Sequence, residues 1–224
     1  MRITQLTLDT HLLLAQKDFY TRQLQFDLVT EEADFFTLRA GGTQLTFRNA
    51  KGEQKPFYHF AFNIPENQME EALQWAKERV QIVQWKGIEV HDFHNWNAHA
   101  FYFFDPAGNI VEFIARHDLS NEATTAFQAT SITEVSEIGF VVPEIAPFFE
   151  KVQHHLGIPL YSGNLTTFCA AGDPNGLFII VPKDRLWFPV DIPNGVFPTE
   201  VQLASNQPAW EANGLPYSID TVRI

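Results

Sequence analysis

The sequence predicts an α+β protein built from repeated βαβββ modules, in which each helix packs on short strands. Two observations carry this prediction. A strand followed by a helix restarts near residue 57 and again near residue 137, and the segment DPAGNIVEFI (105–114) superposes without a gap on DPNGLFIIVP (173–182). Similarity at a fixed period indicates a repeated supersecondary unit. The chain is therefore expected to contain at least three related modules.

The first module is expected within residues 3–48. Residues 3–9 alternate apolar and polar side chains, as a half-buried strand does. Residues 15–26 have near-helical apolar spacing. Short strands at 35–39 and 43–48 flank the turn Gly41-Gly42.

The second module begins with the alternating segment 57–64, FYHFAFNI. Residues 66–80, ENQMEEALQWAKERV, form the clearest helical pattern in the sequence, because their apolar side chains gather on one stripe. Strands at 99–104 and 110–116 follow around the turn DPAGN, where proline and glycine are typical turn residues. We assign residues 1–117 to one domain made of these two modules.

Residues 118–134 are predicted to be a linker, since the stretch is rich in Asn, Thr, Ser and Ala and has little periodicity. The remaining chain, 135–224, is predicted to hold the third module and a degenerate extension. The third module comprises strands at 137–142, 165–171 and 177–181 and a helix at 145–156. Beyond residue 183 only strands at 200–204 and 219–224 are expected, as a degenerate fourth unit that covers the open edge of the third module.

The composition restricts the class of partner. There are 15 basic and 27 acidic residues, which gives a net charge of -12 and disfavours nucleic acid and anionic membrane surfaces. The single cysteine, Cys169, cannot form an internal disulfide, and neither a secretion signal nor a membrane span is visible. We predict a cytoplasmic protein whose partner is a small molecule, since 21 phenylalanines can line a pocket as well as fill a core.

An aromatic strand, the turn DPAGN and a strand carrying Glu112, preceded by the strand and helix of residues 57–80, resemble the vicinal oxygen chelate superfamily. This superfamily includes glyoxalases, bleomycin-resistance proteins and extradiol dioxygenases. The resemblance covers residues 1–117 and extends to 136–182 as a third module. It implies that the first two modules pair, so that their curved sheets enclose a cavity holding a divalent metal.

The resemblance maps the metal-ligand positions of the family onto Gln5, Thr46, His59 and Glu112. Each lies on the more polar face of its predicted strand. We predict a metal site of Gln5, His59 and Glu112, with Fe, Mn, Zn or Ni as the ion. Gln5 replaces the first histidine of the dioxygenases, and Thr46 stands where glyoxalases carry a carboxylate. A buried Glu112 would need the metal or an arginine such as Arg48 beside it.

Two further residues resemble the dioxygenase pattern. Tyr102 lies ten positions before Glu112, where those enzymes place an active-site tyrosine, and His94 lies near the position of their acid-base histidine. We predict Tyr102 and His94 as catalytic residues, because a histidine near a metal-bound oxygen can move protons near neutral pH.

The repeat also compares the two halves of the chain. His59 superposes on Glu137, and Glu112 superposes on Ile180. Because one carboxylate does not make a metal site, the C-terminal half is interpreted as structural, as a dimerisation element or as a lid over the first pocket.

Three functions remain open on the sequence. The preferred one is a metal-dependent enzyme acting on a small oxygen-rich substrate, such as a catechol-like diol or an oxo-acid. The alternatives are a metal-free protein that sequesters a ligand, as bleomycin-resistance members do, and a catalytically inactive scaffold kept for dimerisation. A homodimer is compatible with all three.

Overall fold

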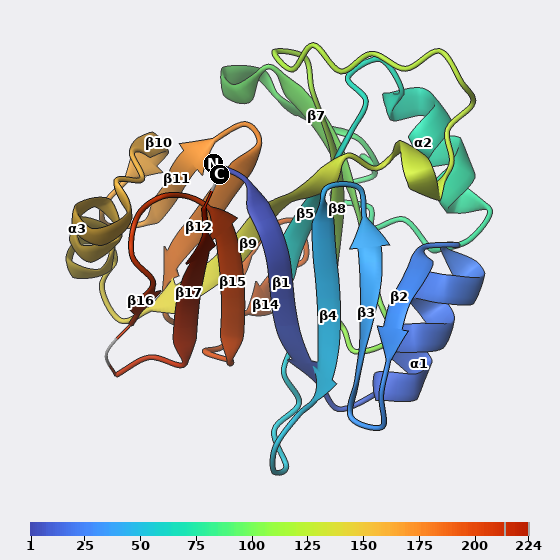
Figure 1. Ribbon diagram of the computed structural model, residues 1–224. Helices are drawn as coiled ribbons and strands as arrows, with labels where there is room; N and C mark the ends of the chain where they lie inside the picture. Colours follow the sequence, from blue (N-terminus) through green and yellow to red (C-terminus); the bar gives the residue numbers. More distant parts are fainter. Residues whose placement is uncertain (213, 224) are drawn as a thin grey trace.

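The computed structural model describes residues 1–212 and 214–223, and their secondary structure repeats the order expected for βαβββ modules (Figure 1). The first module contains β1 (Ile3–Thr10), α1 (Leu13–Asp18), β2 (Asp27–Glu31), β3 (Phe35–Ala40) and β4 (Thr43–Asn49). The second contains β5 (His59–Ile64), α2 (Met69–Lys77), β6 (His91–Phe93), β7 (Ala98–Phe104) and β8 (Ile110–Arg116). The repeated α+β architecture predicted from the sequence is confirmed.

The third module contains β9 (Glu134–Val142), α3 (Ile145–Leu156), β10 (Leu160–Asn164), β11 (Phe168–Asp173) and β12 (Gly176–Pro182). A short hairpin of β13 (Leu186–Trp187) and β14 (Ile192–Pro193) follows. The chain then forms β15 (Thr199–Ala204), β16 (Trp210–Glu211) and β17 (Tyr217–Val222). Ile224, the last residue of the predicted strand 219–224, lies outside the described residues.

The last three strands form a fourth module, whose described residues contain no helix. In each complete module the first and last strands pair in parallel, and β15 pairs with β17 in the same way. The predicted degenerate fourth unit is therefore present. It does not cover the edge of the third module, however, because β15 pairs antiparallel with β1 at the other end of the chain.

The modules pair in a nested order. Within the described residues one sheet has the strand order β16-β17-β15-β1-β4-β3-β2, which joins the first and fourth modules. The other has the order β10-β11-β12-β9-β5-β8-β7-β6, which joins the second and third modules through β5 and β9. The expected pairing of the first two modules is wrong, since β1 and β5 take other partners.

The segment 118–134 does not separate two sheets, because each sheet contains strands from both sides of it. The segment also contributes to the core: Phe127 and Ile132 are buried, and a 3-10 turn (Ala129–Ser131) interrupts the extended chain. The division of the chain into 1–117, 118–134 and 135–224 stays a prediction about independent folding units.

The two sheets share one hydrophobic core. Leu6 and Leu8 of β1 lie in the same buried cluster as Phe60 and Phe62 of β5, and the ring centroids of Phe47 and Phe60 are 6.5 Å apart. Side chains alternate across a strand, so the neighbouring residues point away from this core. The faces that point away from this core therefore lie on opposite sides of the molecule, and on the second sheet that face carries a smaller buried apolar cluster around Ala61, Ile179 and Trp187.

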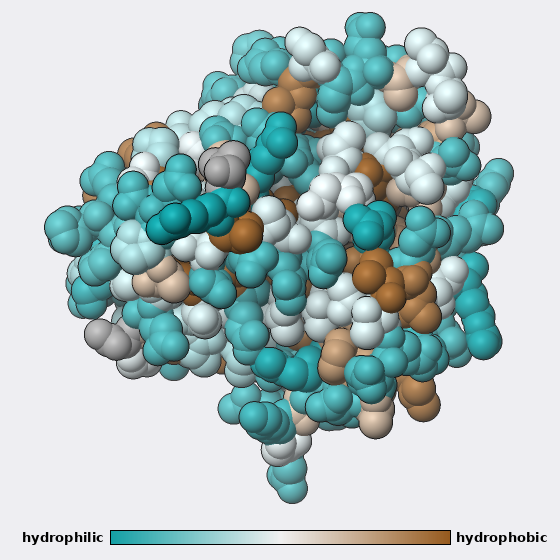
Figure 2. Space-filling model, viewed as in Figure 1, coloured by the Kyte–Doolittle hydropathy of each residue, from teal (hydrophilic) through white to brown (hydrophobic). Residues whose placement is uncertain are grey.

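The outer face of the first sheet lies toward the viewer in Figure 1, where β17, β15, β1, β4 and β3 run side by side. On the same view of the surface, hydrophilic and intermediate residues predominate and hydrophobic ones form small patches (Figure 2). The candidate site lies on the other sheet.

The DPAGN turn ties the first module to the second. The Oδ1 atom of Asp105 accepts backbone N–H groups of Ala107 and Asn109, both at 3.0 Å. Its Oδ2 atom accepts the Gln16 amide at 2.7 Å, the Tyr20 hydroxyl at 3.0 Å and the Asn109 amide at 2.7 Å. Asp105 is buried, so these contacts satisfy a carboxylate that has lost its water.

None of the helices in the described residues is long and apolar enough to span a lipid bilayer.

Candidate metal centre

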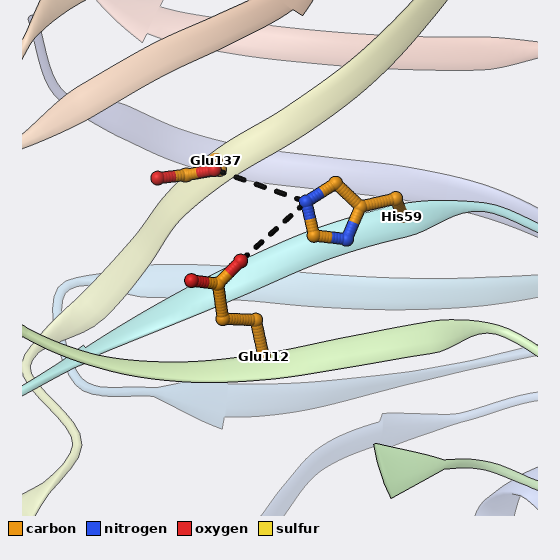
Figure 3. A group of neighbouring side chains, drawn as sticks. All are labelled: His59, Glu112 and Glu137. Carbon is orange, nitrogen blue, oxygen red and sulfur yellow. Dashed lines mark ion pairs between the residues drawn. The ribbon is translucent and has the colours of Figure 1, made fainter. Parts of the chain in front are cut away.

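Three side chains from adjacent strands meet on the outer face of the second sheet: His59 of β5, Glu112 of β8 and Glu137 of β9 (Figure 3). Strand pairing explains the meeting, because Ala61 of β5 lies opposite Glu112 on one side and opposite Glu137 on the other. One potential ligand atom from each residue lies within 4.8 Å of the others. All three residues are buried.

The ring of His59 is held so that one nitrogen faces the carboxylates. Its Nδ1 atom lies 3.1 Å from the carbonyl oxygen of Ile110. A carbonyl can only accept a hydrogen bond, so Nδ1 carries the proton and Nε2 keeps a lone pair in the neutral ring. Nε2 lies 3.5 Å from Glu112 Oε2 and 3.8 Å from Glu137 Oε2 (Figure 3). This is the arrangement of a histidine that ligates a metal.

A buried arginine holds Glu137. The Nη2 atom of Arg116 forms an ion pair with Glu137 Oε1, and its Nε atom donates to Asn63 Oδ1 at 3.2 Å. Arg116 thereby orients Glu137 and leaves Oε2 facing His59. The expectation that Arg48 would lie beside Glu112 is wrong, because Arg48 pairs with Asp9 and Glu200 on the other sheet.

Within residues 1–212 and 214–223, Glu112 has no such cation of its own. Burial raises its pKa well above the usual range, and the nearby Glu137 carboxylate raises it further. Arg116 and the hydroxyl of Tyr102 act in the opposite direction. Two buried carboxylates and one guanidinium leave one negative charge to be neutralised by a proton or by a cation.

The donor set fits a divalent ion. Carboxylate oxygens and a neutral imidazole nitrogen are ligands for manganese, iron and zinc. Two donors bonded to one ion at about 2.1 Å lie at most about 4.2 Å apart. The distances of 3.5 and 3.8 Å from His59 Nε2 to the two carboxylates lie within that limit. All three donor atoms lie within 4.8 Å of one another, so small side-chain adjustments would bring them around one ion.

Gln5 and Thr46, the other two residues mapped to metal-ligand positions, lie on the first sheet. Gln5 lies in β1, opposite Gln44 and Gln202, and its amide is 3.4 Å from the hydroxyl of Thr7. Thr46 lies in β4, buried, with its hydroxyl 2.8 Å from that of Thr37. The prediction that each residue lies on the polar face of its strand agrees with the core packing. The prediction that Gln5 joins His59 and Glu112 is wrong, since their sheets pack back to back.

Glu137 is the residue that the sequence interpretation set aside. The repeat places it at the position of His59, and the first strands of the second and third modules pair with each other. The pairing is antiparallel and places the equivalent residues Phe60 and Ile138 opposite each other, so their neighbours His59 and Glu137 lie close together. The internal repeat could therefore have identified Glu137 as a third ligand, provided that the second module had been paired with the third.

The repeat alignment is also shifted by one residue near its end. Ala61 lies opposite Glu112, and Gly139, its equivalent in β9, lies opposite Ile179. Ile179, and not Ile180, occupies the position of Glu112 and faces the cavity. Because Ile179 is apolar, this fourth equivalent position supplies no metal ligand, and the cluster has three donors.

A cavity of about 550 Å³ opens above the three donors. Besides the donors it is lined by Asp92, Phe93, His94, Asn95, Trp96, Tyr102, Ser162, Phe168, Ile179, Arg185, Trp187 and Phe188. This volume is typical of small-molecule sites, and both aromatic and polar side chains line the cavity.

Both residues predicted to be catalytic line this cavity. Tyr102 lies directly opposite Glu112 across the β7–β8 pair and is buried. Burial and then the charge of Glu112 raise its pKa well above the usual range, so its hydroxyl keeps its proton. His94 is exposed, in the single 3-10 turn His94–Trp96 that follows β6. Their catalytic roles remain predictions.

The hairpin after β12 covers the donors. Trp187 of β13 is buried, and its ring centroid lies 5.2 Å from that of His59. Gly139 of β9 makes room for it, because a Cβ at this position would lie 2.7 Å from the Trp187 ring. Part of the C-terminal half therefore forms a cover over the site, as one interpretation of the sequence expected.

No family model matches this sequence, and no curated protein does. Solved structures do match. A putative dioxygenase from Bacillus subtilis subsp. subtilis str. 168 is 14% identical over 99% of this chain and 85% of that chain, with a TM-score of 0.65. A glyoxalase I mutant from Zea mays is 12% identical over 90% of this chain and 74% of that chain, with a TM-score of 0.58.

A second glyoxalase I mutant from Zea mays is 13% identical over 92% of this chain and 76% of that chain, with a TM-score of 0.57. Identities at this level establish the fold and leave the activity to the site itself. The chain has the fold of the vicinal oxygen chelate superfamily, to which these glyoxalase and dioxygenase neighbours belong.

Proposed function

We propose that this protein is a metal-dependent enzyme of the vicinal oxygen chelate type, which acts on a small oxygen-rich substrate. Its ion would be held by His59, Glu112 and Glu137. The observation that carries the proposal is the position of His59 Nε2, which faces two buried carboxylates at 3.5 and 3.8 Å at the floor of a cavity. A structural ion pair would have no need to lie under an accessible cavity of this volume.

A divalent ion in this position would act as a Lewis acid on oxygen atoms of the substrate. With two carboxylates in the donor set, manganese or iron suits the site better than zinc or nickel. Three protein donors leave further coordination positions open to a substrate with two neighbouring oxygens.

The surrounding residues have separate roles in this proposal. Arg116 orients Glu137 through their ion pair. The protonated hydroxyl of Tyr102 faces the floor and can donate a hydrogen bond to a substrate oxygen. The exposed His94 lines the same cavity and is a candidate for proton transfer to or from a bound substrate. Trp187 and Phe188 shield the floor from bulk solvent.

The test is metal content. Protein purified without chelator or affinity-tag metal would be analysed for iron, manganese, zinc and nickel, and then titrated with Mn²⁺ by calorimetry. We expect about one equivalent per chain. H59A and E112Q should lose it, whereas the exposed helix residues of α3 serve as matched controls, so H155A and E150Q should retain it. Failure of the wild type to take up any ion contradicts the proposal.

A metal-free binding protein is the second candidate, and one observation favours it. Arg116 already neutralises Glu137, and the raised pKa of Glu112 allows a proton to neutralise the other carboxylate. The cluster can therefore be uncharged without metal. An empty wild type that still binds small aromatic ligands would support this candidate and refute the enzyme.

The proposal also includes a cytoplasmic location and a small molecule as the partner, in keeping with the net charge of -12 and the single buried Cys169. A homodimer remains a prediction. Light scattering on the purified chain would measure its mass directly.

A further inference from the structure

Aromatic side chains line much of the cavity, and we call this part of its lining the aromatic slot. Phe93 and Trp96 stack with their ring centroids 6.1 Å apart and their planes at 29°, and Phe168 lies 6.2 Å from Trp96. Trp187 and Phe188 provide further aromatic surface. Aromatic walls pack well against an aromatic ligand, because stacked and edge-on ring contacts add to the burial of apolar area.

Arg185 is a cation of this aromatic lining that has no counterion among the described residues. Arg185 is half-buried in the wall, and its guanidinium carbon lies 5.4 Å from the ring centroid of Phe168. Its side chain donates to the carbonyl of Leu186 at a long 3.4 Å. Among the described residues no carboxylate, Asp92 of the same cavity included, lies within 4.0 Å of it.

Arg185 thus differs from the two arginines discussed above. Arg116 and Arg48 both pair with carboxylates. Burial lowers the pKa of Arg185, as expected for a charge that has lost water and gained no partner. Binding of an anion should be more favourable at such a half-buried guanidinium than at a fully solvated one. Part of the cost of removing water from the guanidinium has already been incurred on folding.

We propose that Arg185 binds the carboxylate of an aromatic acid, whose ring fills the aromatic slot and whose oxygens at the other end reach the His59, Glu112 and Glu137 floor. The inference rests on the proposed function and names its substrate class. A guanidinium matches the two oxygens of a carboxylate. A phosphate dianion is disfavoured, since Asp92, Glu112 and Glu137 line the same cavity.

Four probes separate the two ends of such a ligand: 3,4-dihydroxyphenylacetate has both a diol and a carboxylate, 4-methylcatechol has the diol alone, phenylacetate has the carboxylate alone, and toluene has neither. Each would be titrated into Mn²⁺-loaded and chelator-treated protein, with tryptophan fluorescence and calorimetry as readouts. The variants are R185Q, the charge-retaining R185K, and K183Q. Lys183 is exposed two residues away, so K183Q removes the same charge outside the cavity.

We expect each acid to bind the wild type at least about tenfold more tightly than its neutral counterpart, a difference of about 1.4 kcal/mol. R185Q should abolish this preference without weakening 4-methylcatechol, R185K should keep part of it, and K183Q should keep all of it. Equal loss in K183Q and R185Q would show general charge attraction and overturn the assignment, as would an acid preference unchanged in R185Q.

The probes also separate this inference from the proposed function. If the floor binds no metal, the diol gains nothing from Mn²⁺, yet phenylacetate should still prefer the wild type to R185Q. If Arg185 has no role, the diol should gain from Mn²⁺ while the carboxylate contributes nothing in any variant. Thermal unfolding of each variant would establish that it is folded.

Discussion

Replacement of Arg116 by methionine links the candidate metal site to the stability of the fold. Arg116 is 1% exposed and its partner Glu137 is 2% exposed, so the substitution leaves two buried carboxylates without a cation. Removal of one partner of a buried ion pair costs about 3–5 kcal/mol. For a chain of this size that free energy corresponds to a fall in Tm of about 6–20 °C.

The loss should depend on pH in a defined direction. Arg116 lowers the pKa of Glu112, so R116M raises that pKa further above its usual range. A carboxyl group whose pKa is raised by folding stabilises the fold fully below its unfolded pKa, and this contribution is lost as pH rises through the folded value. R116M should therefore be close to wild type near pH 4 and most destabilised at neutral pH.

Urea unfolding of chelator-treated protein at several pH values would measure these differences, with R39M as the control because Arg39 is exposed on β3. Addition of Mn²⁺ should restore part of the stability of R116M, since the ion would replace the missing positive charge. A loss below about 1 kcal/mol at neutral pH would refute the reasoning, because it would equal the effect of an exposed pair.

Three further substitutions test other parts of the structure. D105N replaces a carboxylate, which accepts all five of its hydrogen bonds, by an amide whose NH2 group would face donors. The free energy of unfolding should therefore fall by about 3 kcal/mol. A urea midpoint equal to that of the wild type would contradict the role given to the turn. G139A places a Cβ against Trp187, and overpacking should cost about 1–3 kcal/mol and weaken ligand binding while metal content stays at the wild-type level. Y102F removes a hydroxyl that lowers the pKa of Glu112, so half-maximal Mn²⁺ uptake should move to higher pH. An unchanged uptake curve would show that Tyr102 does not act on Glu112.

Much of the local structure could be predicted from the sequence. The helix expected at 145–156 is α3 with the same bounds, because its apolar residues keep helical spacing until Gly157 ends it with a positive φ of 67°. The first helix is shorter than expected and continues as a π-helix, Phe19–Gln23. The strand β2 escaped prediction because it is exposed along its whole length and shows no alternation.

The candidate site could be predicted only in part. His59 and Glu112 follow from one module, and their spacing in the sequence reflects the parallel pairing of β5 with β8. The third ligand depends on which module pairs with the second one. The alternation of apolar and polar residues along a strand shows which face a residue is on, but it does not show which strand lies beside it. Glu137 and Gln5 both lie on polar faces, and the sheet topology decides between them. The aromatic cover could not be predicted, since residues 183–198 have no periodicity.

The nested pairing of modules has a consequence for synthesis of the chain on the ribosome. The second and third modules are adjacent in sequence, so their sheet, with the donor cluster, can assemble as soon as residue 182 has emerged. The β1 strand must wait for β15, nearly the whole chain later, and until then its edge is unpaired. An exposed strand edge is a site for mispairing with other chains. Ribosome-stalled chains should therefore gain metal binding before the first sheet is protected from aggregation.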